Sequence, residues 1–189
     1  NVTGAWVGEY TPVYVSVDID VLDPARDIDG IHPLNAGLLA LGYDGFLPAT
    51  AHAAVEILKS RVFKDFPKLK IIIPHGGGAI PYQWNRQRGL HVKEGLEPFE
   101  EMARKVYWDM AIYDKESMEL LIKRVGADRV LFATEMFGAV NAIDPETGRN
   151  FEDLVPIFKS VEGLSEQDRY KITEGNARRL YSRLFAETK

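Results

Sequence analysis

The sequence predicts an α/β protein whose sheet is built from parallel strand–helix units, and three observations support this. Short apolar runs rich in Ile and Val alternate with amphipathic stretches, the order expected of a parallel sheet covered by helices. Several of these runs end in a histidine or an acid, at the point where parallel sheets carry reactive groups. The chain has 189 residues, whereas a closed barrel of eight βα units needs about 250. We therefore expect an open sheet or part of a barrel, whose uncovered edges favour a homo-oligomer.

The local sequence pattern predicts each element of secondary structure. Runs of β-branched and other apolar residues predict strands over residues 13–20, 69–73, 106–112 and 130–133. The segment 23–45 is rich in Gly, Pro, Asp and Asn and is expected to be loop. Apolar residues at helical spacing predict helices over residues 49–64, 80–90, 96–105, 117–125, 151–161 and 166–185. Thr50 and Ser165 are the expected N-caps of the first and the last of these helices.

Composition and charge exclude several classes of function. The chain has no cysteine, which excludes disulfides, thiolate metal sites and a cysteine nucleophile. Its net charge is −5, so no basic excess favours nucleic acid as a partner. No apolar run approaches the roughly 20 residues of a membrane span, and residues 1–4 lack the features of a signal peptide. We expect a cytoplasmic protein that holds any metal through His, Asp or Glu side chains.

Polar side chains follow three of the predicted strands. His75 comes just after the strand at 69–73, Asp109 lies late in the next strand, and Glu135 follows the last one. The carboxyl ends of parallel strands meet at one edge of a sheet, so these side chains should lie close together. Glu135 stands in an apolar stretch, and its carboxylate must therefore be paired, bound to a metal or protonated. Asp109 is expected to act as a structural hydrogen-bonding group.

Residues that follow the histidine indicate a binding role. Gly76 and Gly77 come directly after it, and glycine lets the backbone adopt positive φ and approach a ligand closely. Arg86 and Arg88 lie near the end of the next predicted helix, where two arginines could bind a carboxylate substrate bidentately. Either arginine could equally face solvent or form a salt bridge to the acid that follows the last strand.

Five segments of the second part of the chain carry a resemblance to one family. They are residues 61–70 (RVFKDFPKLK), 71–82 (IIIPHGGGAIPY), 130–139 (VLFATEMFGA), 143–148 (IDPETG) and 174–180 (EGNARRL). Together they resemble the carboxyl-terminal half of the 4-oxalomesaconate hydratases, in the amidohydrolase group that includes aminocarboxymuconate-semialdehyde decarboxylase. The FPxLK, HGGG and GNARRL segments mark the wider group, and the Glu-Met pair after the last strand marks the narrower family.

The resemblance implies a TIM (β/α)8 barrel with zinc at its carboxyl-end face. The implied reaction is the addition of water to an unsaturated polycarboxylate such as 4-oxalomesaconate, during the breakdown of aromatic compounds. Glu135 would bind the metal, and His75 would face metal and substrate as an acid or base. The candidate substrate-binding residues are those that the local sequence indicates, Gly76, Gly77, Arg86 and Arg88. The chemistry is consistent, because zinc polarises a bound oxygen and a nearby histidine moves the proton.

The first sixty residues resemble other families. Residues 13–25 (VYVSVDIDVLDPA) resemble a strand-end motif of the ureohydrolases arginase and agmatinase, in which Asp18 and Asp20 would bind manganese. Residues 27–59 resemble methylenetetrahydrofolate dehydrogenase/cyclohydrolase. The chain is therefore interpreted as a mosaic, a chimera that was engineered or assembled from gene fragments. Its two units are the segment 1–60 and an amidohydrolase-like half-barrel over residues 61–189.

The amidohydrolase group carries a His-x-His metal-binding pair that has no counterpart here, because the histidines are His32, His52, His75 and His91. A catalytic zinc normally needs three protein ligands. Three hypotheses consequently stay open. The first is a zinc-dependent hydratase that uses His75 and Glu135, and the second is a non-catalytic or designed α/β scaffold. The third is a manganese ureohydrolase-like protein that uses Asp18, Asp20 and Asp23.

Overall fold

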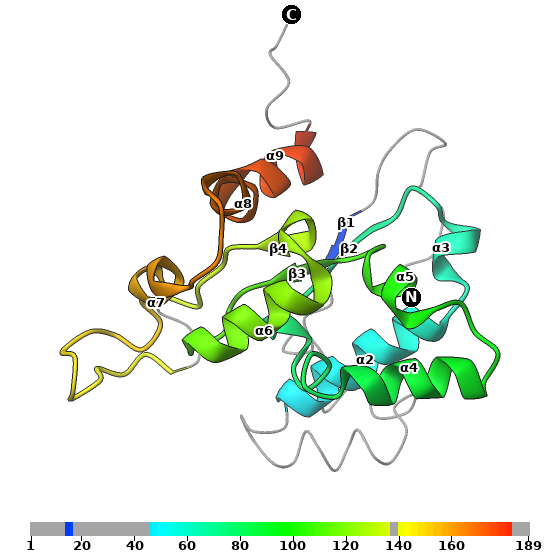
Figure 1. Ribbon diagram of the computed structural model, residues 1–189, viewed down its shortest axis with the longest axis horizontal. Helices are drawn as coiled ribbons and strands as arrows, with labels where there is room; N and C mark the ends of the chain where they lie inside the picture. Colours follow the sequence, from blue (N-terminus) through cyan, green and yellow to red (C-terminus); the bar gives the residue numbers. More distant parts are fainter. Residues whose placement is uncertain (1–13, 17–45, 137–139, 183–189) are drawn as a thin grey trace, which may run out of the picture.

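In the computed structural model, the described residues are 14–16, 46–136 and 140–182. Four strands form one sheet in the order β1–β2–β3–β4, and they span Tyr14–Ser16, Lys70–Ile73, Tyr107–Asp109 and Val130–Leu131. Every neighbouring pair is parallel, which confirms the α/β prediction. Strand β1 comes from the predicted strand at 13–20, and it pairs with β2. Over the described residues the sheet stays open and does not close into a barrel (Figure 1).

Helices fill the connections between these strands and follow the last of them. They are α2 (Phe46–Lys59), α3 (Val62–Asp65), η4 (His75–Gly77), α4 (Trp84–Lys93), α5 (Phe99–Ala103), α6 (Lys115–Val125), η5 (Ala127–Arg129), α7 (Val155–Ser160), α8 (Glu166–Tyr170), the π-helical η6 (Lys171–Gly175) and α9 (Asn176–Leu180). The helix predicted over 80–90 begins only at Trp84, because residues 78–83 form turns. The helix predicted over 166–185 is confirmed over 166–180, where α8, η6 and α9 follow one another without a break and η6 is a π turn.

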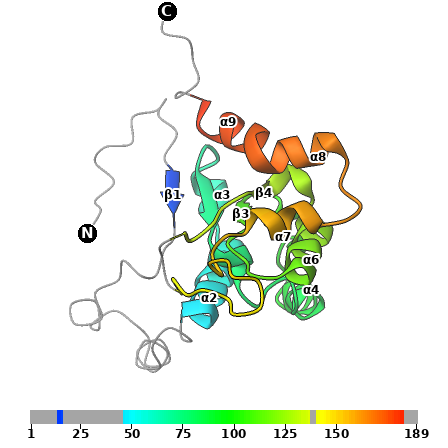
Figure 2. The ribbon, with the colours of Figure 1, turned by 90° about the vertical axis from the view of Figure 1, so that its left-hand side faces the viewer.

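The sheet is buried on both faces, as parallel sheets usually are. On one face Ile71, Ile73, Trp108 and Val130 join the main core, together with buried residues of α2, α4, α5, α6 and α7. On the other face Ile72, Tyr107 and Leu131 pack with residues of α9. Figures 1 and 2 show this arrangement, with α2 and α4 on one side of the strands and α8 and α9 on the other.

The centre of the main core is Trp108 in β3. Its side chain has no exposed surface, and its indole Nε1 donates a hydrogen bond to the Ala103 carbonyl at 3.0 Å. A buried indole that keeps a partner for its N–H contributes burial without an unsatisfied polar group. This side chain therefore fixes the position of β3, on which the candidate site depends.

Side-chain caps begin two of the helices that flank the site. Asp114 accepts from the Ser117 backbone N–H at 2.7 Å at the start of α6. Ser165 accepts from the Asp168 N–H at 3.1 Å at the start of α8, which confirms the predicted cap. Each contact satisfies a backbone donor that has no partner inside its helix.

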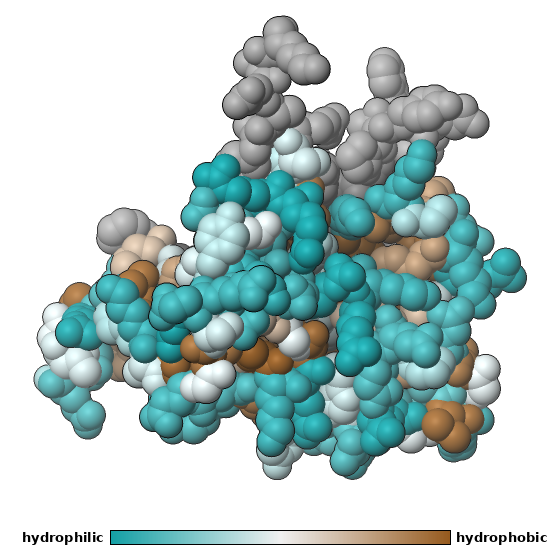
Figure 3. All heavy atoms as spheres, turned by 45° about the horizontal axis from the view of Figure 1, so that its top comes forward, coloured by the Kyte–Doolittle hydropathy of each residue, from teal (hydrophilic) through white to brown (hydrophobic). Residues whose placement is uncertain are grey.

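Figure 3 views the side of the molecule on which α8 and α9 lie. Hydrophilic side chains cover most of this face, and hydrophobic side chains gather in smaller patches between them. None of the described helices has both the length and the hydropathy that a bilayer crossing requires.

Candidate active site

Three strands bring their polar residues to the carboxyl edge of the sheet, as the sequence predicts. His75 follows β2, Asp109 ends β3, and Glu135 follows β4. His75 Nδ1 lies 3.5 Å from Glu135 Oε1, and both side chains are mostly buried, with 15% and 23% of their surface exposed. An imidazole and a carboxylate at this distance form an ion pair when the imidazole is protonated.

A tyrosine hydrogen-bonds to the carboxylate of this pair. The hydroxyl of Tyr113 donates a 2.7 Å hydrogen bond to Oε2 of Glu135, so the two carboxylate oxygens face two different partners. Burial raises the pKa of the Tyr113 phenol, and the hydrogen bond to Glu135 and the charges of Glu135 and Glu152 raise it further. Tyr113 therefore stays protonated at neutral pH and acts as a donor.

The position of His75 depends on Asp109. Oδ1 of Asp109 accepts from the backbone N–H of His75 at 2.8 Å and from that of Ala111 at 3.1 Å. His75 has a positive φ of 52°, a conformation that side chains rarely adopt without support. Burial raises the pKa of the Asp109 carboxyl, although its backbone donors and the charge of His75 oppose the shift. This agrees with the expected structural role, since Asp109 fixes the turn that presents His75.

The glycines after His75 serve the turn itself. Gly76 and Gly77 have φ values of 59° and 76°, so the predicted positive φ is confirmed. A Cβ at Gly77 would lie 2.8 Å from Cε3 of Trp108, and one at Gly76 would lie 3.0 Å from Cγ1 of Ile112. The close approach that glycine permits here is to the protein's own side chains, and a role in substrate binding stays a prediction.

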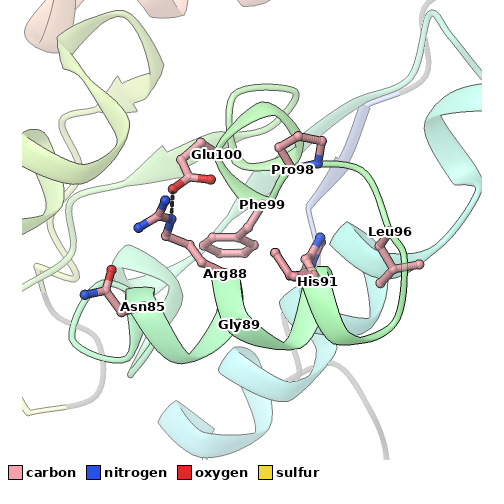
Figure 4. Close-up of a pocket in the computed structure, with 9 residues that line it drawn as sticks. Asn85, Arg88, Gly89, His91, Leu96, Pro98, Phe99 and Glu100 are labelled. Atoms are coloured by element: carbon pink, nitrogen blue, oxygen red, sulfur yellow. Dashed lines mark ion pairs between the residues drawn. The ribbon is translucent and has the colours of Figure 1, made fainter.

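The two arginines lie on α4, apart from the histidine–glutamate pair. Arg88 forms an ion pair with Glu100 and lines a separate cavity of about 490 Å³ between α4 and α5, together with Phe99 and His91. Figure 4 shows Arg88 and Glu100 pointing toward each other above Phe99. Arg86 is exposed. Within the described residues neither arginine pairs with Glu135, and their role toward a substrate stays a prediction.

Sequence reasoning missed two residues of this region, Tyr113 and Glu152. Glu152 is fully buried and accepts from the backbone N–H groups of Val140 and Asn141 at 2.9 and 3.0 Å. It thereby holds part of the loop that continues from Glu135. The signal for Tyr113 is its place just after the third strand and one residue before the Asp114 cap of α6. Glu152 had no comparable signal, because its partners are backbone groups of an irregular loop.

The described residues do not supply a complete zinc centre. His75 and Glu135 offer two ligand-type side chains, and Asp109 already accepts backbone hydrogen bonds. Nowhere among residues 14–16, 46–136 and 140–182 do three His, Cys, Asp or Glu side chains form a group that could hold a metal ion. A catalytic zinc needs three protein ligands. Asp18, Asp20 and Asp23, which the manganese alternative uses, lie outside the described residues.

Comparisons with known proteins agree with the arrangement of these strands. A family model described as Amidohydrolase matches residues 12–183. A 2-keto-4-carboxy-3-hexenedioate hydratase of Sphingobium sp. is 39% identical over 147 residues, which are 76% of this chain and 42% of that protein. The crystal structure of 4-oxalomesaconate hydratase from Rhodopseudomonas palustris matches with 38% identity and a TM-score of 0.70, over 81% of this chain and 44% of that one.

A more distant structure carries a metal. A dihydroxybenzoic acid decarboxylase from Polaromonas sp., solved with bound manganese, matches with 25% identity and a TM-score of 0.62 over 83% of this chain and 48% of that one. The present chain thus spans less than half of the length of these relatives.

A second, short similarity points to another protein. The bifunctional protein FolD of Bacillus subtilis is 54% identical over 41 residues, which are 22% of this chain and 14% of that protein. A match of this size beside the much longer hydratase match fits the mosaic that the sequence predicts.

Proposed function

The chain belongs to the amidohydrolase family, and from that premise we propose that it carries the acid–base half of a hydratase site. The substrate class is an unsaturated polycarboxylate such as 4-oxalomesaconate. The observation that carries the proposal is the contact between His75 and Glu135, 3.5 Å apart, which come from two different strand ends. The similarity to two hydratases at 39% and 38% identity supports the choice of reaction.

The chain's own residues can move the proton that hydration requires. Hydration forms a carbon–oxygen bond at one carbon of the double bond and a carbon–hydrogen bond at its neighbour, with no change in net oxidation. His75 faces Glu135 through Nδ1, which leaves Nε2 to exchange a proton with water or with the substrate carbon. The hydrogen bond from Tyr113 orients the Glu135 carboxylate that faces the imidazole. General acid–base catalysis of this kind contributes about 10²–10⁴-fold in rate.

Zinc at this site is part of the proposal, and it requires a donor beyond those described. Glu135 and Nδ1 of His75 would be two of its ligands, which leaves Nε2 for the proton, and the bound ion would supply Lewis-acid polarisation of an oxygen. Residues 61–189 would form the amidohydrolase-like unit and residues 1–60 the other part of the mosaic. A second copy of the chain could cover the open sheet, and oligomer formation is part of the same proposal.

The test measures hydration of 4-oxalomesaconate through the loss of ultraviolet absorbance of its conjugated double bond, with zinc or manganese added. His75→Asn should lower kcat about 10²-fold or more. The matched control is His52→Asn, since His52 is exposed on α2, and it should leave kcat unchanged. Wild-type protein that shows no hydration with either metal would overturn the proposed activity.

Metal content separates the hydratase from the alternatives. Elemental analysis of purified wild-type protein and of Glu135→Gln should find about one zinc per chain that the variant loses, if the stoichiometry of a single catalytic zinc holds. Metal that persists in Glu135→Gln would point to other ligands, such as those of the manganese alternative. No metal in either sample, together with no activity, would favour the non-catalytic scaffold.

A further inference from the structure

At the amino end of the sheet, opposite the candidate active site, five basic side chains surround one cavity. The cavity is about 540 Å³ in volume, and its charged lining residues are Arg104, Lys123, Arg124, Arg129, Arg179 and a single acid, Asp128. Arg104 follows α5 just before β3, and Asp128 and Arg129 lie in η5 just before β4. His75 and Glu135 follow strand ends at the other edge, so this cavity is separate from their site.

The cations of this basic cavity lack acidic partners. In the part of the chain that the structure describes, none of the five forms an ion pair, whereas Lys59, Lys115 and Arg178 elsewhere on the surface are paired with glutamates. The acid of the lining, Asp128, is paired with Lys171 at 3.2 Å. Five positive charges therefore converge in a protein whose net charge is −5.

Three of the guanidinium groups are held in place by contacts that leave their charge uncompensated. Arg129 lies 5.2 Å from the ring centroid of Tyr107, and Arg124 lies 5.9 Å from that of Trp84. Arg179 donates to the Asp128 carbonyl at 2.8 Å and to Asn176 Oδ1 at 2.9 Å. Ring and carbonyl contacts orient a guanidinium without neutralising it. These three guanidinium groups are thus preorganised for a ligand.

The guanidinium of Arg124 is not fully hydrogen-bonded within the described residues. Its Nε atom is buried and has no hydrogen-bond partner among the described residues. The carboxyl-terminal dipole of α6 stabilises nearby cations, and it accounts for part of the attraction at Lys123 and Arg124, which lie in the last turn of that helix. That dipole is equivalent to about half an elementary charge, too little to balance five cations.

We propose that this basic cavity binds a compact multivalent oxyanion, a small molecule with two or more phosphate or carboxylate groups. Its volume falls within the range of about 300–1,000 Å³ that is typical of small-molecule sites. Arginine is suited to such a ligand because its planar fork of donors matches phosphate and carboxylate oxygens. The cavity is distinct from the proposed hydratase site, so the two proposals can fail independently.

The experiment is isothermal titration of the full chain with pyrophosphate, with citrate and with acetate, at one fixed ionic strength. Saturable binding of one pyrophosphate or one citrate per chain, with no saturation by acetate, is expected. Tighter binding of pyrophosphate would identify phosphate groups as the preferred chemistry, and tighter binding of citrate would identify carboxylates. Absence of saturable binding for both multivalent anions would overturn the proposal.

Variants locate the site. Arg124→Gln should weaken pyrophosphate binding about tenfold, the loss expected for one charge-assisted hydrogen bond. Lys123→Gln is a second variant at an exposed position, where folding is not at risk. Lys159→Gln, exposed on α7, is the matched control and should bind as the wild type does. His75→Asn should also leave pyrophosphate binding unchanged, and equal weakening in all four variants would contradict a defined site.

Discussion

At the carboxyl end of the sheet His75, Asp109 and Glu135 each have a polar partner, whereas at the amino end five cations surround a cavity without forming an ion pair to any described acid. The first arrangement is satisfied within the chain itself, through backbone N–H groups, a phenol and one imidazole–carboxylate contact. The positive charges of the second arrangement are unbalanced unless an anionic ligand binds there. Substitutions at the carboxyl end should therefore destabilise the fold, and removal of the exposed Lys123 charge at the amino end should not.

The largest effect at the carboxyl end is expected at Gly77. Gly77→Ala would force a Cβ against the buried ring of Trp108 at a φ of 76°. Overpacking costs about 1–3 kcal/mol, and the left-handed backbone costs a further 1–2 kcal/mol, roughly. The free energy of unfolding, measured with urea, should fall by about the sum of these two contributions.

Substitutions at two other glycines separate the cost of overpacking from the cost of the backbone conformation. Gly95 has a φ of 65° and no atom within 4 Å of the point where a Cβ would stand, and Gly89 lies inside α4 with equal space. Gly95→Ala should show only the cost of the backbone conformation, and Gly89→Ala should stabilise the helix by about 0.5–1 kcal/mol. If Gly77→Ala cost no more than Gly95→Ala, the contact with Trp108 would not be what requires glycine there.

The next effect concerns the hydrogen bond from Tyr113 to Glu135. Tyr113→Phe removes the donor from Oε2 of a mostly buried carboxylate, and we expect a loss of about 1 kcal/mol in the free energy of unfolding. Tyr82→Phe is the matched control, because Tyr82 is 79% exposed, and it should change nothing. An equal effect of both substitutions would show that the hydrogen bond to Glu135 contributes little.

A smaller effect of Tyr113 should appear in alkaline solution. Its pKa is raised in the folded state by burial and by Glu135, so above pH 10 the folded state binds more protons than the unfolded chain. Stability that Tyr113 contributes is therefore fully present below pH 10 and is lost as the pH rises further. The difference in urea midpoint between wild type and Tyr113→Phe should shrink from pH 8 to pH 11, and a constant difference would contradict the raised pKa.

The sequence could predict those residues of the site that lie at the ends of strands. Apolar runs identify β2, β3 and β4, and parallel pairing then places His75, Asp109 and Glu135 at one edge. Tyr113 lies in the short segment between β3 and α6, where no periodicity indicates a direction for its side chain. Its contact with Glu135 spans 22 positions of the chain, and only the three-dimensional arrangement of the strands creates it.

Long-range contacts also accompany the π turn in the last helical segment of the described residues. The sequence over 166–185 has helical spacing throughout, yet η6 opens into a π turn before α9. The buried side chain of Asn176 donates to the carbonyls of Ala127 and Val130, both at 2.7 Å. These bonds tie α9 to the start of β4 and accompany the widened turn. Helical periodicity predicts the unbroken helical run over 166–180, but it does not encode the tertiary contact that accompanies the π turn within it.

The smallest expected effect contrasts two lysines of the same helix. Lys115 of α6 is paired with Glu162 at 2.8 Å and with Glu119 at 3.6 Å, whereas Lys123 lines the basic cavity. Lys115→Gln should lower the free energy of unfolding slightly, because ion pairs between exposed side chains contribute little. For Lys123, repulsion from the other cations that line the cavity opposes the helix-dipole stabilisation of about 0.3–1 kcal/mol.

Lys123→Gln should consequently leave stability unchanged or raise it by up to about 0.5 kcal/mol in low salt. This gain should disappear near 0.5 M salt, roughly, because screening removes the repulsion. Urea unfolding of both variants at two salt concentrations makes the comparison, with Lys159→Gln as the control outside both clusters. A loss of stability in Lys123→Gln as large as that in Lys115→Gln would show that the basic cavity is already balanced within the chain, and that no external anion is needed to explain it.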